Sequence, residues 1–301
     1  MEFIDAHHHL WAPKTPELDV GYVWLKNIGG MRPFGDPTPI QRDYLLDELR
    51  GEPEGARMIG SVHLQCDPRI PDPVAETAFI QKLSDDAGFP IAIVGYADFA
   101  SGSCAQHLEG HMAYPNFRGI RQIISYLPDD PAHSFVQTNL LDDLTWRSQF
   151  GLLADYGLSF DLMLYPHQMR HAAAFFADHP DIPVVLEHLG SPLNRSEAGM
   201  KLWAEGMQAL AALPHVHAKL SGYAMYFRDR LDDEARMVTQ RILEWFGPDR
   251  VMFGSNFPVD RLYLTYNQAF DLVREELGGD VEVQRAVFRE NAARFYRLDI
   301  R

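Results

Sequence analysis

The chain has 301 residues, of which 46% are hydrophobic, and its formal net charge at pH 7 is −15. A single α/β barrel commonly takes roughly 250 residues, so this length predicts one domain that spans residues 1–301. The acidic net charge argues against a basic surface that binds nucleic acid, and no apolar run is long enough to cross a membrane. The sequence also shows no leader pattern. We therefore expect a cytoplasmic protein that binds neither nucleic acid nor a membrane.

Short segments rich in Val, Ile and Leu alternate with helical patterns along the chain, and Gly, Pro, Asn or Asp bounds each one, as is typical of buried parallel strands. The expected strands are 3–7, 58–64, 91–97, 119–124, 159–164, 184–188, 215–220 and 251–254. Apolar stripes with helical spacing lie between them. They include Met169, Ala172, Ala173 and Phe176, and Tyr266, Phe270, Val273 and Leu277. Eight such units predict an α/β fold, a (β/α)8 TIM barrel, and not a doubly wound open sheet, because no Gly-rich phosphate turn follows a strand.

The first expected strand ends in His7, His8 and His9. Side chains alternate along a strand, so His7 and His9 face one side and His8 faces the other. Catalytic residues of a (β/α)8 barrel gather where strands end and loops begin. Two imidazoles on one face at such a place form half of a metal site or a pair of acid/base groups.

Residues 11–39 follow without clear periodicity, with many Pro and Gly residues and with aromatic side chains that include Trp24. A segment of this length without secondary structure in a compact domain is usually functional or disordered. Its aromatic residues favour an ordered loop that covers the mouth of the barrel. We expect Trp24 to contact the substrate.

Polar residues mark the ends of five later strands. They are Arg118 and Arg121, Tyr165 and His167, His188, Lys219, and Asn256 followed by Asp260. Arg118 and Arg121 differ by three positions, so only one can face inward, and we favour Arg121 as a clamp for a substrate carboxylate or hydroxyl group. Tyr165, His167 and Asp260 are further expected substrate-binding residues. Lys219, in an apolar strand, either stabilises an oxyanion or forms a salt bridge with Glu187 or Asp161.

Five segments, in the order of the expected strands, carry a family resemblance. They read IDAHHHLW at 4–11, FRGIRQI at 117–123, EHLG at 187–190, KLSG at 219–222 and FGSNFPVD at 253–260. Together they resemble the amidohydrolase superfamily, and best its lactonase branch, which includes 2-pyrone-4,6-dicarboxylate lactonase and sugar lactonases of the fuconolactonase type. The resemblance implies a barrel in which His7, His9 and His188 surround the reacting carbonyl.

The resemblance is incomplete on the last strand. In the wider superfamily an aspartate there ligates the metal or acts as general base, and this chain has Asn256 instead. Asparagine cannot take a proton as a base and is a weak zinc ligand. The lactonase branch, in which catalysis without a tightly held metal is known, accommodates this change best. The proton acceptor is then another residue, either His188 or Asp260.

We predict a hydrolase that opens a small lactone, from sugar-acid or aromatic breakdown, by attack of an activated water on the ester carbonyl. His7, His9, His188, Asn256 and Lys219 are the expected catalytic residues. No cofactor is strictly required, but His7, His9, His188 and a water would satisfy tetrahedral zinc. The alternatives are a zinc-dependent amide or ester hydrolase, a non-oxidative decarboxylase and a barrel that only binds its ligand. The two cysteines, Cys66 and Cys104, have no partner at metal-ligand spacing, and the sequence leaves the oligomeric state open.

Overall fold

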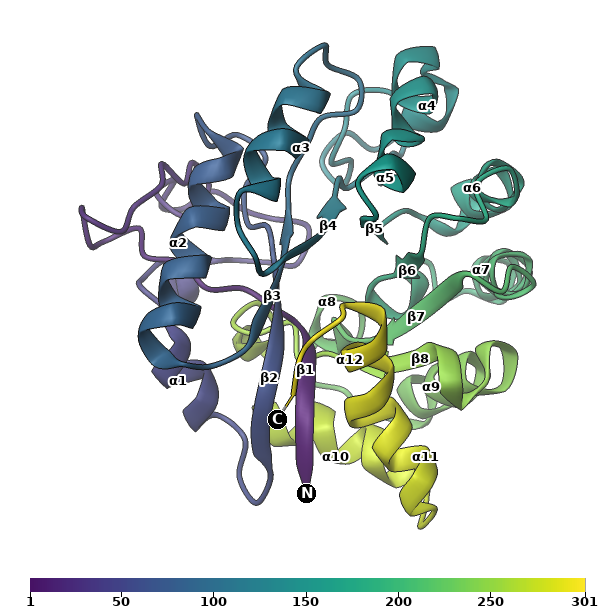
Figure 1. The fold of residues 1–301 in the computed structure, drawn as a ribbon. Coiled ribbons are helices and arrows are strands. Elements are labelled where there is room, and N and C mark those ends of the chain that lie inside the picture. The colour runs from purple at the N-terminus through teal and green to yellow at the C-terminus, as the bar shows by residue number, and fades with distance from the viewer. Residues whose placement is uncertain (301) are drawn as a thin grey trace.

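A computed structural model describes residues 1–300 and contains one parallel sheet with strand order β1 to β8 (Figure 1). Its strands are β1 (Glu2–His8), β2 (Arg57–Leu64), β3 (Ile91–Gly95), β4 (Phe117–Arg121), β5 (Ser159–Leu162), β6 (Val184–Leu186), β7 (Val216–Leu220) and β8 (Val251–Phe253). The segment after β8 meets the end of β1, where His8 bridges to Phe257 and the Asn256 amide donates to the His7 carbonyl at 2.7 Å. The sheet thus forms a nearly closed barrel, which confirms the predicted (β/α)8 fold.

Helices lie between the strands and around the outside of the sheet (Figure 1). They are α1 (Leu46–Gly51), α2 (Pro73–Ala87), α3 (Cys104–Met112), α4 (Leu144–Phe150), α5 (Leu152–Asp155), α6 (Pro166–Ala177), α7 (Glu197–Ala211), α8 (Tyr223–Phe227), α9 (Asp233–Phe246), α10 (Tyr266–Leu277), α11 (Val281–Arg285) and α12 (Asn291–Phe295). The two predicted stripes fall in α6 and α10, and all of their residues are buried. Within residues 1–300, no helix combines the length and the apolar character that a membrane span needs.

Successive residues of a strand pack on opposite sides of the sheet. On β1, Phe3 joins the large apolar cluster that the sheet forms with its helices. Ile4 and Ala6 belong to a second cluster, to which α12 and the residue after it contribute Phe295 and Tyr296. A two-sided strand of this kind needs apolar residues at nearly every position, which explains the continuous Val, Ile and Leu runs in the sequence.

All eight predicted strands are present, but several end earlier at the mouth of the barrel. β4 stops before Gln122, whose side-chain oxygen accepts hydrogen bonds from the Phe99 amide and from the Trp146 indole of α4. β6 stops two residues early, because His188 and Leu189 have φ values of 52° and 57°, which lie in the left-handed region and turn the chain. The residues beyond these ends form the loops of the mouth.

The long loop after β1 covers this mouth, as its aromatic residues predicted. Its ends are joined by two backbone hydrogen bonds between Trp11 and Tyr44, of 2.9 and 3.1 Å. Trp24 and Phe34 are buried, and the Trp24 indole donates to the Cys66 carbonyl at 2.9 Å. The loop is therefore packed into the molecule, and its side chains are available to line a pocket.

Candidate active site

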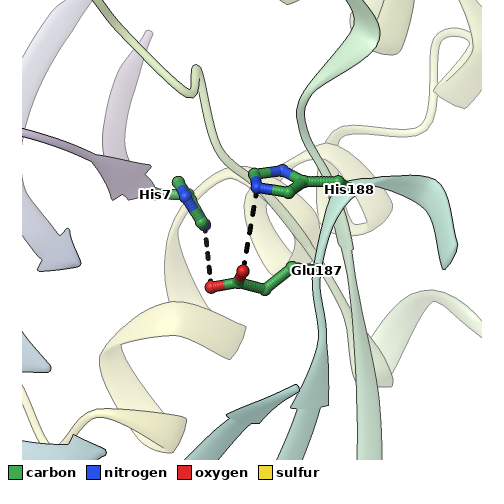
Figure 2. Close-up of side chains that lie close together, drawn as sticks. All are labelled: His7, Glu187 and His188. Atoms are coloured by element: carbon green, nitrogen blue, oxygen red, sulfur yellow. Dashed lines mark ion pairs between the residues drawn. The ribbon is translucent and has the colours of Figure 1, made fainter. Parts of the chain in front are cut away.

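Two strand ends bring a carboxylate and two imidazoles together at the mouth. His7 lies near the end of β1, and Glu187 and His188 directly follow β6 (Figure 2). Glu187 Oε1 lies 3.4 Å from His7 Nδ1, and Glu187 Oε2 lies 3.7 Å from His188 Nε2. The two imidazole ring centroids are 4.4 Å apart, and all three side chains are buried. The structure brings His7 and His188 together as expected. From the sequence, we expected Glu187 only as a possible salt-bridge partner of Lys219.

Backbone irregularities aim these side chains. The register between β1 and β2 shifts between Asp5 and His8, and such a bulge redirects the residue within it, here His7. His188 and Asn256 have φ values of 52° and 57°. Non-glycine residues in this left-handed region cost about 1–3 kcal/mol each and persist where the surrounding structure fixes them. The fold therefore tolerates local strain at two residues of the site.

Burial and nearby charges keep the imidazoles neutral. The pKa of His7 lies well below its ordinary value, because burial and then the charges of His188 and Lys219 disfavour protonation. The pKa of His188 is also well below its usual range, through burial and then through Arg121 and Lys219. Burial raises the pKa of Glu187, against the effect of Arg121, whose Nη1 lies 3.3 Å from Oε2. Neutral imidazoles keep a lone pair that can accept a proton or bind a cation.

His9 stands beside this cluster, with its ring centroid 5.2 Å from that of His7. Its Nδ1 lies 2.8 Å from the Leu64 carbonyl oxygen. Because a carbonyl can only accept, Nδ1 carries the ring proton and Nε2 keeps its lone pair. Burial, followed by the charge of Arg121, holds the pKa of His9 well below its ordinary value. His9 is therefore a neutral proton acceptor with a fixed tautomer.

Lys219 forms a salt bridge, which is one of its two expected roles. Its Nζ lies 2.5 Å from Asp161 Oδ1, and both side chains are fully buried. The Tyr296 hydroxyl donates to the same oxygen at 2.7 Å, and Lys219 Nζ is also 3.5 Å from His7 Nδ1. Lys219 is not among the residues that line the pocket described next. It therefore influences the site through its charge and through His7.

A cavity with about 470 Å³ of empty space, here called the mouth pocket, adjoins the cluster. Its polar lining includes His9, Arg121, His188 and Asn256. Its large apolar lining residues are Trp11, Trp24, Phe34, Phe135, Met163 and Met225, so the long loop supplies much of the wall. An apolar wall with a few convergent polar groups is typical of a small-molecule site.

Asn256 lines the mouth pocket, and Asp260, which is hydrogen-bonded to it, does not. Asn256 Nδ2 donates to Asp260 Oδ1 at 2.8 Å, and the Ala224 amide donates to Asp260 Oδ2 at 3.1 Å. Asp260 is fully buried, and this burial raises its pKa from 3.8 to about 7. The structure therefore places Asp260 behind Asn256, and not against a ligand in the pocket.

The other expected binding residues are more scattered. Tyr165 lines a smaller neighbouring cavity, and its hydroxyl donates to the His133 carbonyl at 2.5 Å. His167 is exposed in the first turn of α6 and is not among the residues that line the mouth pocket. Arg118 donates to the Pro115 and Phe117 carbonyls, away from the pocket. Of the two strand-four arginines, Arg121 is thus the one that reaches the site.

The cluster fits a bound cation. One ligand atom from each of His7, Glu187 and His188 lies within 4.8 Å of the others. His7 Nε2 and Glu187 Oε1 are buried without a hydrogen-bond partner, and such atoms are normally paired. Two imidazoles and one carboxylate form a common donor set for zinc with an open fourth position. His7, Glu187 and His188 thus form a candidate donor set that differs from the expected set of His7, His9 and His188 by Glu187 in place of His9, and the expected set stays a prediction.

Cys66 has neighbours that its sequence spacing did not indicate. It lies with His63 and Glu76, and one ligand atom from each is within 4.8 Å of the others. The Cys66 amide already donates to both Glu76 oxygens, at 2.9 and 3.2 Å, and burial and Glu76 raise the pKa of the thiol well above its ordinary value. A protonated thiol and an occupied carboxylate make this group less suited to a metal than the first.

Comparison with known proteins agrees with this geometry. The amidohydrolase family model matches residues 4–298. An uncharacterized protein from Sinorhizobium fredii is 35% identical, over 98% of both chains. L-fucono-1,5-lactonase from Burkholderia ambifaria is 30% identical over 98% of this chain and 96% of its own. A crystal structure of an amidohydrolase from Burkholderia multivorans with bound zinc is 26% identical, covers 99% of this chain and all of its own, and has a TM-score of 0.76.

The barrel, the cluster at its strand ends and these matches define a hydrolase. The chain belongs to the amidohydrolase family, over nearly its whole length. The resemblance carried by the five sequence motifs is confirmed, because lactonases are among the relatives.

Proposed function

We propose that the protein hydrolyses the ester bond of a small lactone. The observation that carries this proposal is the neutral, tautomer-fixed His9 in a pocket next to the buried His7–Glu187–His188 cluster. A proton acceptor beside groups that can polarise a carbonyl supports the proposal, because ester hydrolysis needs both. The L-fucono-1,5-lactonase relatives, at 30% and 28% identity, support a lactone as the ester.

His9 acts as the general base in this reaction. Its Nε2 accepts a proton from a water molecule while the water oxygen attacks the ester carbon. When the ring C–O bond breaks, the leaving alkoxide oxygen takes that proton, so His9 returns to its neutral form. Its low pKa favours this return. The product is a hydroxy acid that ionises and releases one proton to the solution.

Other residues orient the substrate and stabilise its charge. The Arg121 guanidinium, held by Glu187 and the Gln65 carbonyl, faces the pocket as a fixed positive charge for the developing oxyanion. Asn256 Nδ2 is engaged by Asp260, so Asn256 Oδ1 remains to accept a hydrogen bond from water or from a substrate hydroxyl group. Zinc held by His7, Glu187 and His188 would supply a Lewis acid for the carbonyl.

Proton release from a panel of γ- and δ-lactones, including L-fucono-1,5-lactone, tests the proposal. We expect turnover by the wild type and a loss of about 10²–10⁴ in kcat for His9→Gln, which removes the base. Arg118→Gln is the control for a polar substitution outside the pocket and should keep full activity. Arg118 lies on the same strand as Arg121, but its side chain points away from the pocket. Full activity in His9→Gln would refute the assignment of the base.

The same assay separates the competing functions. Turnover of amides or acyclic esters, with no lactone accepted, would favour the zinc-dependent amide or ester hydrolase. Release of carbon dioxide from an aromatic acid would favour a decarboxylase. Binding of a sugar acid without turnover of any of these compounds would favour a barrel that only binds its ligand.

The setting of the enzyme is part of the proposal. We place it in the cytoplasm, in carbohydrate or aromatic catabolism, with a small molecule as its partner. The two cysteines, Cys66 and Cys104, are both free, which is typical of a reducing compartment. Fractionation of the native cells, followed by lactonase assay of each fraction, tests the location.

A further inference from the structure

We infer that the substrate lactone carries a carboxylate group and that Arg32, in the loop over the mouth, binds it. This inference rests on the proposed lactonase function and adds the chemical class of the substrate. L-fucono-1,5-lactone carries hydroxyl groups and no charge. The inference therefore separates this protein from the fuconolactonases that it resembles.

The Arg32 guanidinium has no acceptor among residues 1–300. The residue is half-buried, its Nε is buried without a hydrogen-bond partner, and no ion pair within the described chain includes it. Its Cζ lies 5.3 Å from the centre of the Trp24 ring, a contact that orients the guanidinium but leaves its N–H donors free. Buried polar groups are normally paired, so a ligand is the natural source of the missing acceptor.

The backbone that carries Arg32 is fixed in place. Arg32 and Gly35 exchange two backbone hydrogen bonds of 2.8 and 2.9 Å, which close a tight turn. The Phe34 carbonyl within this turn accepts from Arg228 at 2.6 Å and from the Tyr263 hydroxyl at 3.2 Å. Arg228 directly follows α8, and Tyr263 lies shortly before α10, so both partners come much later in the sequence than Arg32. Arg32 is thus pre-organised, which lowers the entropic cost of binding an anion.

Asp67, the carboxylate whose charge acts on Arg32, does not neutralise it. Asp67 Oδ2 accepts from the amides of Val23 and Trp24, at 2.8 and 3.0 Å. Asp67 Oδ1 accepts from the amide and the Nε of Arg69, at 3.1 and 3.2 Å. The acceptors of Asp67 are therefore already used. Because Arg69 is the ion-pair partner of Asp67, Arg32 keeps the unpaired positive charge there.

Arg32 stands where two cavities meet. It lines the mouth pocket and also a wider neighbouring cavity with about 1140 Å³ of empty space, and both share Cys66, Ile123 and Phe135. No Asp or Glu of the described chain lines the mouth pocket, although the net charge is −15. Arg121, the other arginine there, is engaged by Glu187. Asp67 lines the wider cavity, but it is paired with Arg69. Arg32 is therefore the cation left for a carboxylate that projects from the lactone ring toward the wider cavity.

Two lactones that differ only in charge test this inference. They are 5-oxotetrahydrofuran-2-carboxylate and its primary amide, assayed by proton release. We expect the wild type to prefer the carboxylate. Arg32→Gln should lower kcat/KM for the carboxylate by about 10- to 100-fold, mainly through KM, and lower kcat/KM for the amide much less, because the charge-assisted hydrogen bonds form only with the carboxylate. Arg32→Lys should retain part of the preference. Arg170→Gln removes an equal charge from the exposed face of α6 and is the control.

A wild-type preference for the amide, or equal losses on both lactones in Arg32→Gln, would overturn the inference. Binding of 2-hydroxyglutarate, the product of the carboxylate lactone, gives a readout that does not depend on turnover. Tryptophan fluorescence should show affinity about 10- to 100-fold weaker in Arg32→Gln than in the wild type. Equal affinities would also overturn the inference. If no lactone of the panel is turned over, the proposed function fails, and the binding measurement still decides the role of Arg32.

Discussion

Between pH 5 and pH 8, replacement of Asp260 by asparagine should shift the free energy of unfolding in favour of the variant. Asp260 is fully buried and accepts hydrogen bonds from Asn256 and from the Ala224 amide. Burial outweighs these hydrogen bonds and raises the pKa of Asp260 from 3.8 to about 7. The folded protein thus holds a proton on Asp260 over a pH range in which the unfolded chain has lost it.

The size of the effect follows from the two pKa values. The folded-state pKa is the higher one, so the stability that the bound proton contributes is complete below about pH 4 and is lost as the pH rises toward 7. One pKa unit corresponds to about 1.4 kcal/mol, so the wild type loses roughly 2 kcal/mol from this group between pH 5 and pH 7. The amide of the variant does not titrate, and the variant escapes this loss.

Urea unfolding of the wild type and of Asp260→Asn at pH 5, 6, 7 and 8 measures the effect. The relevant quantity is the difference between the two free energies of unfolding. The titration of other groups cancels in it, including that of Asp5, whose pKa burial raises to about 6. From pH 5 to pH 8 this difference should move in favour of the variant by roughly 3 kcal/mol. A difference that does not change with pH would refute the protonation of Asp260 in the folded state.

Four other substitutions probe the site. His188→Ala should lower lactonase kcat by about 10²–10³, whereas Asn256→Ala, which removes one hydrogen-bonding group, should keep measurable activity; equal losses in the proton-release assay would contradict this order. Lys219→Met removes the buried ion-pair partner of Asp161 and should lower the free energy of unfolding, measured with urea, by about 3–5 kcal/mol. A negligible change would contradict this expectation. Glu187→Gln should lower zinc content after dialysis, measured by elemental analysis; unchanged zinc would place the metal elsewhere.

The sequence predicted those parts of the site that lie within regular strands. Arg118 and Arg121 show why: three positions along a strand reverse the side, so one of them had to face away, and Arg118 does. His7 and His9 also come together as predicted, with ring centroids 5.2 Å apart, although a bulge lies between Asp5 and His8 and β1 ends at His8. The strand count was predictable because a sheet buried on both faces demands continuous apolar runs.

The remaining features depend on places where the chain leaves the strand pattern. Strict alternation would put Glu187 and His188 on opposite faces, but the left-handed backbone at His188 turns the chain and brings both to one cluster. Arg32 lies in a loop without periodicity, so its place depends on contacts with distant segments. Asp260 could be placed behind Asn256 only once the course of the loop was known, since sequence spacing does not fix a loop.

The contact between β1 and the segment after β8, which closes the barrel, has a consequence for the synthesis of this protein. The Asn256 amide donates to the His7 carbonyl at 2.7 Å, and the His9 amide donates to the Phe257 carbonyl at 2.8 Å. Translation at roughly 5–20 residues per second means that His7 waits on the order of tens of seconds for partners about 250 positions later. Until then one edge of β1 is unpaired, and an open strand edge is a template for pairing with another chain. A nascent chain that stops before β8 thus lacks a complete site and exposes a strand edge that can pair with other chains.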